Sequence, residues 1–285
     1  MSVSASAPPL GRPIRGPSAL GGDLRRMLNL TVTLAVLEWK LRFYGSALGY
    51  LWQLMRPLLL FGVLYAVFTQ FIRFGEGVRF YPALLLLGIV LFTFFSDATG
   101  RAVTAVVDKE NLVRKIEFPR LVVPLSVILT AAFNLAFNVL AVLAFVLATG
   151  VDPRLSWLTL PLFVLGVGAF AAGPSLLISA LYVRLRDLRP IWEVFLQVMF
   201  YGSPILYVIE LIPSPSLQKA IVLLNPLATM MVQARATLID ERAPNAWDVA
   251  GGAPLLAIPA LIVIGLLALG FWVFNREAPA IAEEL

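Results

Sequence analysis

The feature that most constrains this 285-residue chain is a succession of six long apolar runs. They cover Tyr50–Phe71, Tyr81–Val107, Leu121–Ala148, Trp157–Val183, Pro190–Ile209 and Pro254–Phe274. Each approaches or exceeds the ~20 residues that an α-helix needs to cross ~30 Å of hydrocarbon. We therefore predict an all-α, polytopic membrane protein, with six transmembrane helices in a single domain over residues 48–275.

The composition supports a membrane protein and excludes several classes of function. The chain is 60% hydrophobic and 14% charged, whereas soluble domains are about a quarter charged. It contains no cysteine and no histidine, which removes disulfides and the commonest metal ligands and general bases. We expect no cofactor in this chain and no catalytic or metal site.

The net charge of +5 would suit a nucleic-acid partner, but its distribution favours a membrane topology signal. The basic residues gather before the first run, between the second and third runs, between the fourth and fifth runs, and after the last run. Lys and Arg are enriched in cytosolic loops and are attracted to anionic headgroups. The pattern predicts that both termini are cytosolic and that nucleic acid is not a partner.

The two ends of the chain differ from its apolar centre. Residues 1–22 are rich in Pro, Gly, Ser and Ala, which predicts a disordered cytosolic tail rather than a cleaved signal peptide. Residues 23–47 place leucines at helical spacing and pair Glu38 with Arg42, which predicts an amphipathic interfacial helix. A short first span is the alternative. Residues 276–285 form a cytosolic C-terminal tail in this interpretation.

The loop over residues 108–120 has the pattern of a docking element. Leu112, Val113 and Ile116 fall on one side of a short charged helix, which Pro119 ends. A short helix with a small apolar stripe suits a groove on a soluble partner. An ordinary positively charged loop is the alternative.

Polar residues recur at helical spacing inside three of the runs. The stripes are Thr93, Asp97 and Arg101; Thr130, Asn134 and Asn138; and Glu193, Gln197 and Tyr201. Intramembrane polar residues are functional candidates by default. The alternatives are a structural ion pair for the first stripe and interhelical hydrogen bonding for the second. The third stripe is a candidate channel lining, because Tyr offers both a ring face and a hydroxyl.

Arg56 lies at the inner start of the first run, beside Pro57. Together with Arg42, Asp97 and Arg101 it would mark a cationic mouth for a lipid diphosphate headgroup. Snorkelling to the interface is the simpler alternative for this arginine. At the other side of the membrane, residues 210–248 contain apolar segments too short to span, which predicts re-entrant or interfacial helices.

Five segments, in order along residues 30–275, resemble one family of transporters. They are Gly49–Pro57 (GYLWQLMRP), Asn111–Arg120 (NLVRKIEFPR), Arg184–Pro190 (RLRDLRP), Gly202–Tyr207 (GSPILY) and Leu224–Ala228 (LNPLA). They look like the permeases of the polysaccharide and polyol-phosphate ABC exporter family. These type 2 ABC transporter subunits export O-antigen, teichoic acid or galactan chains.

The resemblance implies a homodimeric permease with two copies of a separate ATPase, which would carry the ATP and Mg. The sequence agrees in one respect, because it contains no G-x-x-x-x-G-K-[ST] loop. The implied coupling residues are Asn111, Leu112, Val113, Arg114, Lys115, Ile116, Glu117 and Arg120, with a second contact at Arg184, Arg186, Asp187 and Arg189. The implied outer gate consists of short helices with Pro204, Tyr207, Asn225 and Pro226.

Taken with the resemblance, these features predict a multi-pass permease of the bacterial plasma (inner) membrane rather than an enzyme. The expected cargo is a polysaccharide or polyol-phosphate polymer linked to a polyprenyl diphosphate and moved from the cytosol outwards. An exporter of a small drug or lipid is the alternative within the class. A secondary transporter or channel would favour intramembrane acid pairs or repeats, and a membrane-embedded glycosyl or phosphoryl transferase would need clustered acidic residues.

Overall fold

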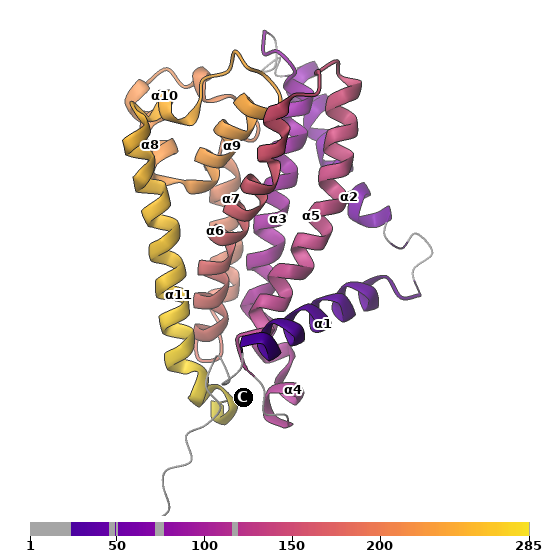
Figure 1. Ribbon diagram of the computed structural model, residues 1–285, viewed down its shortest axis with the longest axis vertical. Helices are drawn as coiled ribbons and strands as arrows, with labels where there is room; N and C mark the ends of the chain where they lie inside the picture. Colours follow the sequence, from indigo (N-terminus) through magenta and orange to yellow (C-terminus); the bar gives the residue numbers. More distant parts are fainter. Residues whose placement is uncertain (1–23, 46–48, 50, 72–76, 116–118, 285) are drawn as a thin grey trace, which may run out of the picture.

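The computed structural model describes residues 24–45, 49, 51–71, 77–115 and 119–284, and within these ranges the chain forms helices and no β-strand. Long helices run side by side in one bundle, with short helices gathered at one end and a helix lying across the other (Figure 1). The prediction of an all-α polytopic membrane protein is confirmed. The proposed tail at residues 1–22 lies outside the described residues.

Within the described residues, five helices, with the short turns that extend them, are long and apolar enough to cross a membrane. They are α2 (Leu51–Ala66, continued by a π-helical turn at Val67–Phe71), α3 (Tyr81–Asp108), α5 (Val122–Ala148), α6 (Leu160–Leu181, preceded by a 3-10 turn at Leu155–Thr159) and α11 (Ala257–Glu284, preceded by a 3-10 turn at Ala253–Leu256). They match the first four runs and the sixth run to within a few residues, except that α11 continues well past Phe274.

The fifth predicted span is wrong in its outer part. Helix α7 (Leu188–Gly202) has 15 residues, or roughly 22 Å at 1.5 Å per residue. The chain is then extended at Ser203, with φ −104° and ψ 150°. The physical reason is Pro204, which disfavours helical backbone in the residue before it and cannot donate a helix hydrogen bond. The apolar residues after Gly202 are buried in this non-helical segment instead.

Short helices close the end of the bundle where α7 stops. Helices α8 (Pro215–Leu224) and α9 (Pro226–Leu238) are bent by 107° relative to each other and together count as a sixth span if taken as one. Asn225 accounts for the bend, since its Oδ1 accepts hydrogen bonds from the N–H groups of Leu227 and Ala228 at 3.1 and 3.2 Å. With α10 (Ala246–Ala250), they are the short helices expected here.

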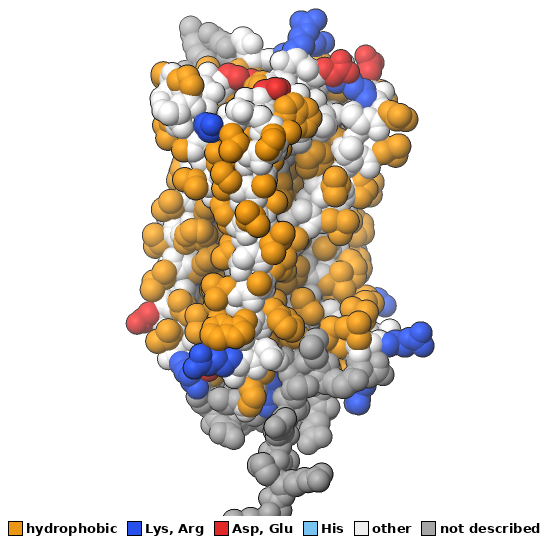
Figure 2. Space-filling view, turned by 60° about the vertical axis from the view of Figure 1, so that its left-hand side comes forward, with side chains coloured by type: hydrophobic (Ala, Val, Ile, Leu, Met, Phe, Trp, Pro, Cys, Tyr) orange, Lys and Arg blue, Asp and Glu red, His pale blue; other side chains and the backbone are white. Residues whose placement is uncertain are grey.

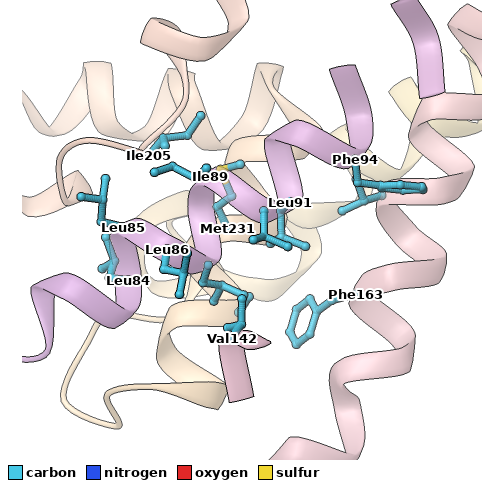
Figure 3. Close-up of a cluster of buried hydrophobic side chains, with 14 of the residues drawn as sticks. Leu84, Leu85, Leu86, Ile89, Leu91, Phe94, Val142, Phe163, Ile205 and Met231 are labelled. Carbon is cyan, nitrogen blue, oxygen red and sulfur yellow. The ribbon is translucent and has the colours of Figure 1, made fainter. Parts of the chain in front are cut away.

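Helix α3 lies at the centre of the hydrophobic core. In its most apolar stretch 72% of the residues are buried, against 11% in α2 and in α11. Figure 3 shows α3 side chains meeting side chains from α5, α6, α9 and the segment after α7. The labelled residues are Leu84, Leu85, Leu86, Ile89, Leu91, Phe94, Val142, Phe163, Ile205 and Met231. The surface that faces outward carries a broad apolar band between charged ends (Figure 2).

Helices α6 and α11 cross with their backbones in contact. A Cβ atom added to Gly270 would lie 2.3 Å from the carbonyl oxygen of Gly173, and one added to Gly173 would lie 2.7 Å from the backbone of Leu266. Small residues permit such close approach between membrane helices. This crossing fixes α11 on the bundle.

The helix across the end of the bundle is α1 (Leu24–Phe43), and α4 (Glu110–Lys115) and the end of α11 lie at the same end (Figure 1). Met27 and Ala35 are buried against the bundle, whereas Leu28 and Leu41 are exposed. A helix with one apolar side on protein and another uncovered suits the membrane interface.

Candidate functional site

A cavity of about 220 Å³ lies between α1, α2, α3 and α5. Its lining is Arg42 from α1; Trp52, Gln53, Arg56 and Pro57 from α2; Val90, Thr93, Phe94, Asp97 and Arg101 from α3; and Ala131, Asn134, Leu135 and Asn138 from α5. The residues predicted to form a cationic mouth and part of the polar stripe of α5 therefore lie around the same cavity. The lining includes all four residues that were predicted to bind a lipid headgroup. It also includes two of the three polar residues of the α5 stripe, Asn134 and Asn138.

Thr130 belongs to the same polar stripe as Asn134 but does not line the cavity. Its side chain is 1% exposed, and its hydroxyl donates to the carbonyl oxygens of Ser126 at 2.7 Å and Ala35 at 3.3 Å. The second of these carbonyls belongs to α1. Thr130 thus joins α5 to α1, which matches the hydrogen-bonding alternative rather than the channel lining.

Positive charge exceeds negative charge around the cavity. Asp97 is the one carboxylate among the described lining residues, and it faces Arg101 with 3.8 Å between Oδ2 and Nη2. Arg42 and Arg56 have no such partner in the lining. Burial lowers the pKa of Arg42, and the positive charges of neighbouring arginines add to this effect. An anion in the cavity would relieve that repulsion.

Two hydrogen-bond donors in the cavity wall have no partner among the described residues: Nη1 of Arg42 and Nδ2 of Asn134. Asn134 is 4% exposed. Its Oδ1 accepts a hydrogen bond from the Trp39 indole at 3.0 Å, and because an indole can only donate, this bond fixes which way the amide points. Buried polar groups almost always have a partner, so these two donors are exceptions among the described side chains.

The position of Arg42 depends on contacts one turn earlier in α1. The Lys109 ammonium contacts the Glu38 carboxylate and lies 3.2 Å from the Ser126 hydroxyl. The Trp39 ring stacks on Phe137 with 5.6 Å between centroids. Glu38 interacts electrostatically with Arg42, as the helical spacing predicts, but its carboxylate is in direct contact with Lys109. Glu38 pairs with Lys109 because the end of α3 comes within reach, which helical spacing in α1 cannot reveal.

A second cavity, of about 290 Å³, lies between α3 and α7. Asp97 and Arg101 line it as well, opposite Arg189 and Glu193. The latter two form an ion pair with 3.3 Å between Nε and Oε1. The pair Asp97–Arg101 is thus a wall shared by both cavities.

The polar stripe of α7 lies on one uncovered side of that helix. Glu193 and Gln197 are exposed and Tyr201 is 61% exposed, beside the exposed apolar residues Val194 and Val198. Within a membrane, a polar side chain of this kind faces protein or a water-filled space. The single chain leaves this face uncovered.

A short helix forms where the docking element was predicted. Helix α4 includes Asn111, Leu112, Val113, Arg114 and Lys115, while Ile116 and Glu117 lie outside the described residues. Asn111 is exposed, but Leu112 packs against buried residues of its own chain. Arg120 is 5% exposed. Among the described side chains of α4, Asn111 is the exposed one.

The second predicted contact lies in the turn between α6 and α7, at the end of the bundle that also holds the last turns of α11. Arg184 pairs with Glu277 of α11 at 2.9 Å, and the Arg186 guanidinium lies 5.1 Å from the centre of the Tyr182 ring. Asp187 stands at the start of α7 without a side-chain cap bond. Arg184, Arg186, Asp187 and Arg189 are all exposed.

The residues predicted to form the gate lie at the opposite end of the bundle. Asn225 Nδ2 donates to the Ser203 hydroxyl at 2.9 Å, and Pro226 begins α9. Pro204 and Tyr207 border a small cavity of about 20 Å³. An ion pair that sequence reasoning missed lies beside them: Arg235 Nη1 and Glu210 Oε2 are 2.7 Å apart. The two residues are 25 positions apart, so no local pattern could have indicated it.

Comparison with known proteins agrees with this architecture. Residues 29–239 match the family model described as ABC-2 type transporter. The O-antigen export system permease protein RfbA of Myxococcus xanthus is 28% identical over 263 residues, which is 92% of this chain and 98% of the relative. A protein of the same name from Klebsiella pneumoniae is 29% identical over 219 residues, 76% of this chain and 83% of the relative.

The chain belongs to the ABC-2 type transporter family. Within it, the bundle of apolar helices and the relatives identify a transmembrane permease subunit of a type 2 ABC exporter. Membership of this family implies association with an ABC ATPase subunit.

Proposed function

We propose that this permease forms the membrane path of an ATP-driven exporter of polysaccharide. The cargo would be a polysaccharide or polyol-phosphate polymer carried on a polyprenyl diphosphate, moved from the cytosol to the outer side of a bacterial plasma membrane. The observation that carries the proposal is the likeness to O-antigen export permeases along 92% of the chain. The cationic cavity and the polar stripe of α7 provide groups suited to such a cargo.

The proposed assembly has two permease copies and two ATPase copies. Glu193, Gln197 and Tyr201 would line a channel between the uncovered sides of two α7 helices. A channel with aromatic and polar walls favours a sugar polymer, whereas a narrow apolar cleft would favour a drug or lipid. The ATPases would dock at the end that carries α4 and the turn between α6 and α7, where basic side chains are concentrated. That end would be cytosolic, as would both termini.

The partner is tested by co-purification of the tagged chain from its native membrane, followed by an ATPase assay. The variant Asn111→Trp places a large side chain on the exposed side of α4 without disturbing Leu112, which is packed inward. We expect it to reduce the recovered ATPase by about tenfold, as is typical when a central interface position is blocked. Leu217→Trp, at the exposed outer helix α8, is the matched control.

The cargo is tested separately in cells that lack the chain. Polysaccharide should disappear from the cell surface, and lipid-linked polymer should accumulate inside. Normal surface polysaccharide with loss of resistance to a small compound would instead indicate the drug exporter. If no ATPase accompanies the wild-type chain, a channel, a secondary transporter or a transferase becomes the better explanation.

A further inference from the structure

We propose that Lys109 is a positioning residue that holds the short helix α4 in a fixed place relative to α1 and α5, so that these three helices move as one body. A displacement of α4 would then reach α1 directly through this side chain rather than along the length of α3. The use of this link in transport rests on the proposed function, whereas the link itself does not.

The first argument is the place of Lys109 in the chain. Helix α3 ends at Asp108 and α4 begins at Glu110, so Lys109 is the one residue between them. Its backbone N–H donates to the carbonyl oxygen of Val107 in α3. Its carbonyl oxygen accepts a hydrogen bond from the N–H of Leu112 in α4 at 2.9 Å. The backbone of Lys109 is therefore bonded to both helices and has to follow any movement of α4.

The second argument is the side chain of Lys109, which reaches the other two helices. Its ammonium contacts the Glu38 carboxylate of α1 and donates to the Ser126 hydroxyl of α5 at 3.2 Å. The side chains of Lys109 and Glu38 are only 19% and 24% exposed, and Ser126 is fully buried. Charge-assisted hydrogen bonds are strong and directional, and they gain strength away from water. This contact therefore fixes how the three helices are oriented.

The third argument is that α1 and α5 are already joined by polar contacts. Ser126, Thr130 and Asn134 lie four residues apart along α5, which places them on one side of the helix. The Thr130 hydroxyl donates to the carbonyl oxygen of Ala35 at 3.3 Å, and the Trp39 indole donates to Asn134 at 3.0 Å. Lys109 joins this row at its Ser126 end and so connects α4 to an existing unit of two helices.

Apolar packing of α4 does not replace this link. Leu112 packs against a cluster that includes Met27 of α1, Val106 of α3 and Val122 of α5. Apolar attraction is non-directional, so it holds α4 against the bundle without setting its orientation. The hydrogen-bonded ion pair at Lys109 supplies the direction that this packing lacks.

The first test measures the distance between α4 and α1 in the full-length chain in nanodiscs. The chain has no cysteine, so spin labels can be attached at Asn111→Cys on α4 and Leu41→Cys on α1, both of which are exposed positions. Pulsed electron resonance then gives the distribution of distances. We expect a narrow distribution in the otherwise unchanged chain, because α4 and α1 are held as one body.

Variants of the ion pair decide the role of Lys109. Lys109→Met keeps the length of the side chain without its charge and should widen the distribution about twofold, because an element with fewer fixed contacts samples more positions. Lys109→Arg should keep it narrow, and Glu38→Lys combined with Lys109→Glu should restore it. Lys219→Met is the control, because Lys219 is also half-buried but lies on α8 at the other end of the bundle. Unfolding temperatures establish that each variant is folded.

The second test separates positioning from stability, and it uses the chain without labels. In Lys109→Met the recovered ATPase and its turnover should stay at the wild-type level, because the exposed Asn111 is unchanged. Surface polysaccharide in cells should nevertheless fall by about tenfold, a factor typical of coupling between distant sites. A residue that only stabilises the fold would lower the amount of chain, the recovered ATPase and export together.

The proposal is overturned if folded Lys109→Met keeps the narrow distribution, or if the exchanged pair fails to restore it. A wider distribution with normal export would also overturn it, since Lys109 would then be a local contact without a positioning role. Absence of an ATPase from the wild-type chain would remove the proposed function alone. The distance measurement needs no ATPase and would still decide whether Lys109 fixes α4 to α1.

Discussion

Helices α11 and α7 both leave a long side uncovered, but the residues on these sides differ in kind. On α11 the exposed side chains up to Trp272 are all apolar, and the large ones are Ile258, Leu261, Ile264, Leu269, Phe271 and Trp272. On α7 the exposed Glu193 and Gln197 interrupt the apolar residues. The apolar surface of α11 is stable in contact with hydrocarbon, whereas placing the polar side chains of α7 in hydrocarbon costs free energy. The exposed side of α11 therefore suits contact with lipid. The exposed side of α7 instead suits contact with another protein surface or with water.

The two helices also differ in how they are held. Helix α11 meets α6 backbone to backbone at Gly173 and Gly270. Helix α7 buries one residue of its own, Leu196, and is joined to α3 by a hydrogen bond of 3.1 Å from the Trp192 indole to the Thr99 hydroxyl. The lipid-facing helix is thus fixed firmly, and the polar helix is held by few contacts.

The largest expected effect is at the crossing of α6 and α11. Gly270→Ala would put a Cβ atom 2.3 Å from the Gly173 oxygen, so the helices must separate, and we expect about 3 kcal/mol of destabilisation. Thermal unfolding in detergent measures it. Gly265→Ala on the same helix meets nothing within 4 Å and should leave the unfolding temperature unchanged or higher. Equal shifts would show that the close crossing does not stabilise the bundle.

The next effect distinguishes the two uncovered sides directly. The chain has no cysteine, so single cysteines can be introduced without removing native ones. A membrane-impermeant maleimide should label Gln197→Cys at least about tenfold faster than Ile264→Cys, because thiols react as hydrated thiolates. Oxidation should also cross-link two copies through the first position and not the second. Equal labelling would place both sides against lipid.

A third effect concerns transport. Glu193→Gln combined with Gln197→Leu should reduce polysaccharide export by about tenfold while shifting stability by less than about 1 kcal/mol, because these side chains are exposed in the chain. The control is Ile264→Leu on α11, which should leave export unchanged. A stabilised and fully active α7 variant would contradict an aqueous or protein environment for this side.

The smallest effect is on the attachment of α7 to α3. Trp192→Phe removes the indole donor to Thr99 and should destabilise the protein by about 1 kcal/mol, the typical net value of one hydrogen bond. Thr99→Val should give a similar value, and the double variant should fall short of the sum of the two. Full additivity would mean that the two side chains act independently.

Hydropathy predicted most of the fold, because crossing ~30 Å of hydrocarbon requires long apolar helices. The hydropathy-based prediction of a span was wrong after Gly202. The segment there is apolar enough for a membrane span, but Pro204 prevents helical backbone at Ser203. The apolar signal there reports burial in the core rather than a span.

The cavity was predictable only in part. Helical spacing identified Asn134 and Thr130 as candidates but could not separate them, because their roles depend on where α1 crosses α5. The pairing of Glu38 with Lys109 depends on the same crossing. Helical periodicity in the sequence identifies which polar residues lie on one side of a helix. The packing of neighbouring helices decides which of these residues form hydrogen bonds within the protein.

The wall shared by the two cavities has a consequence for their occupancy. Arg101 cannot give its full charge to an anion on one side while it neutralises a group on the other, and Asp97 is subject to the same limit. A ligand that interacts with Arg101 from one side would therefore change the affinity at the other, and linkage requires the factor to be the same in both directions. A change of charge beside Arg42 would alter the electrostatic potential at the face of α7 without any movement of the helices.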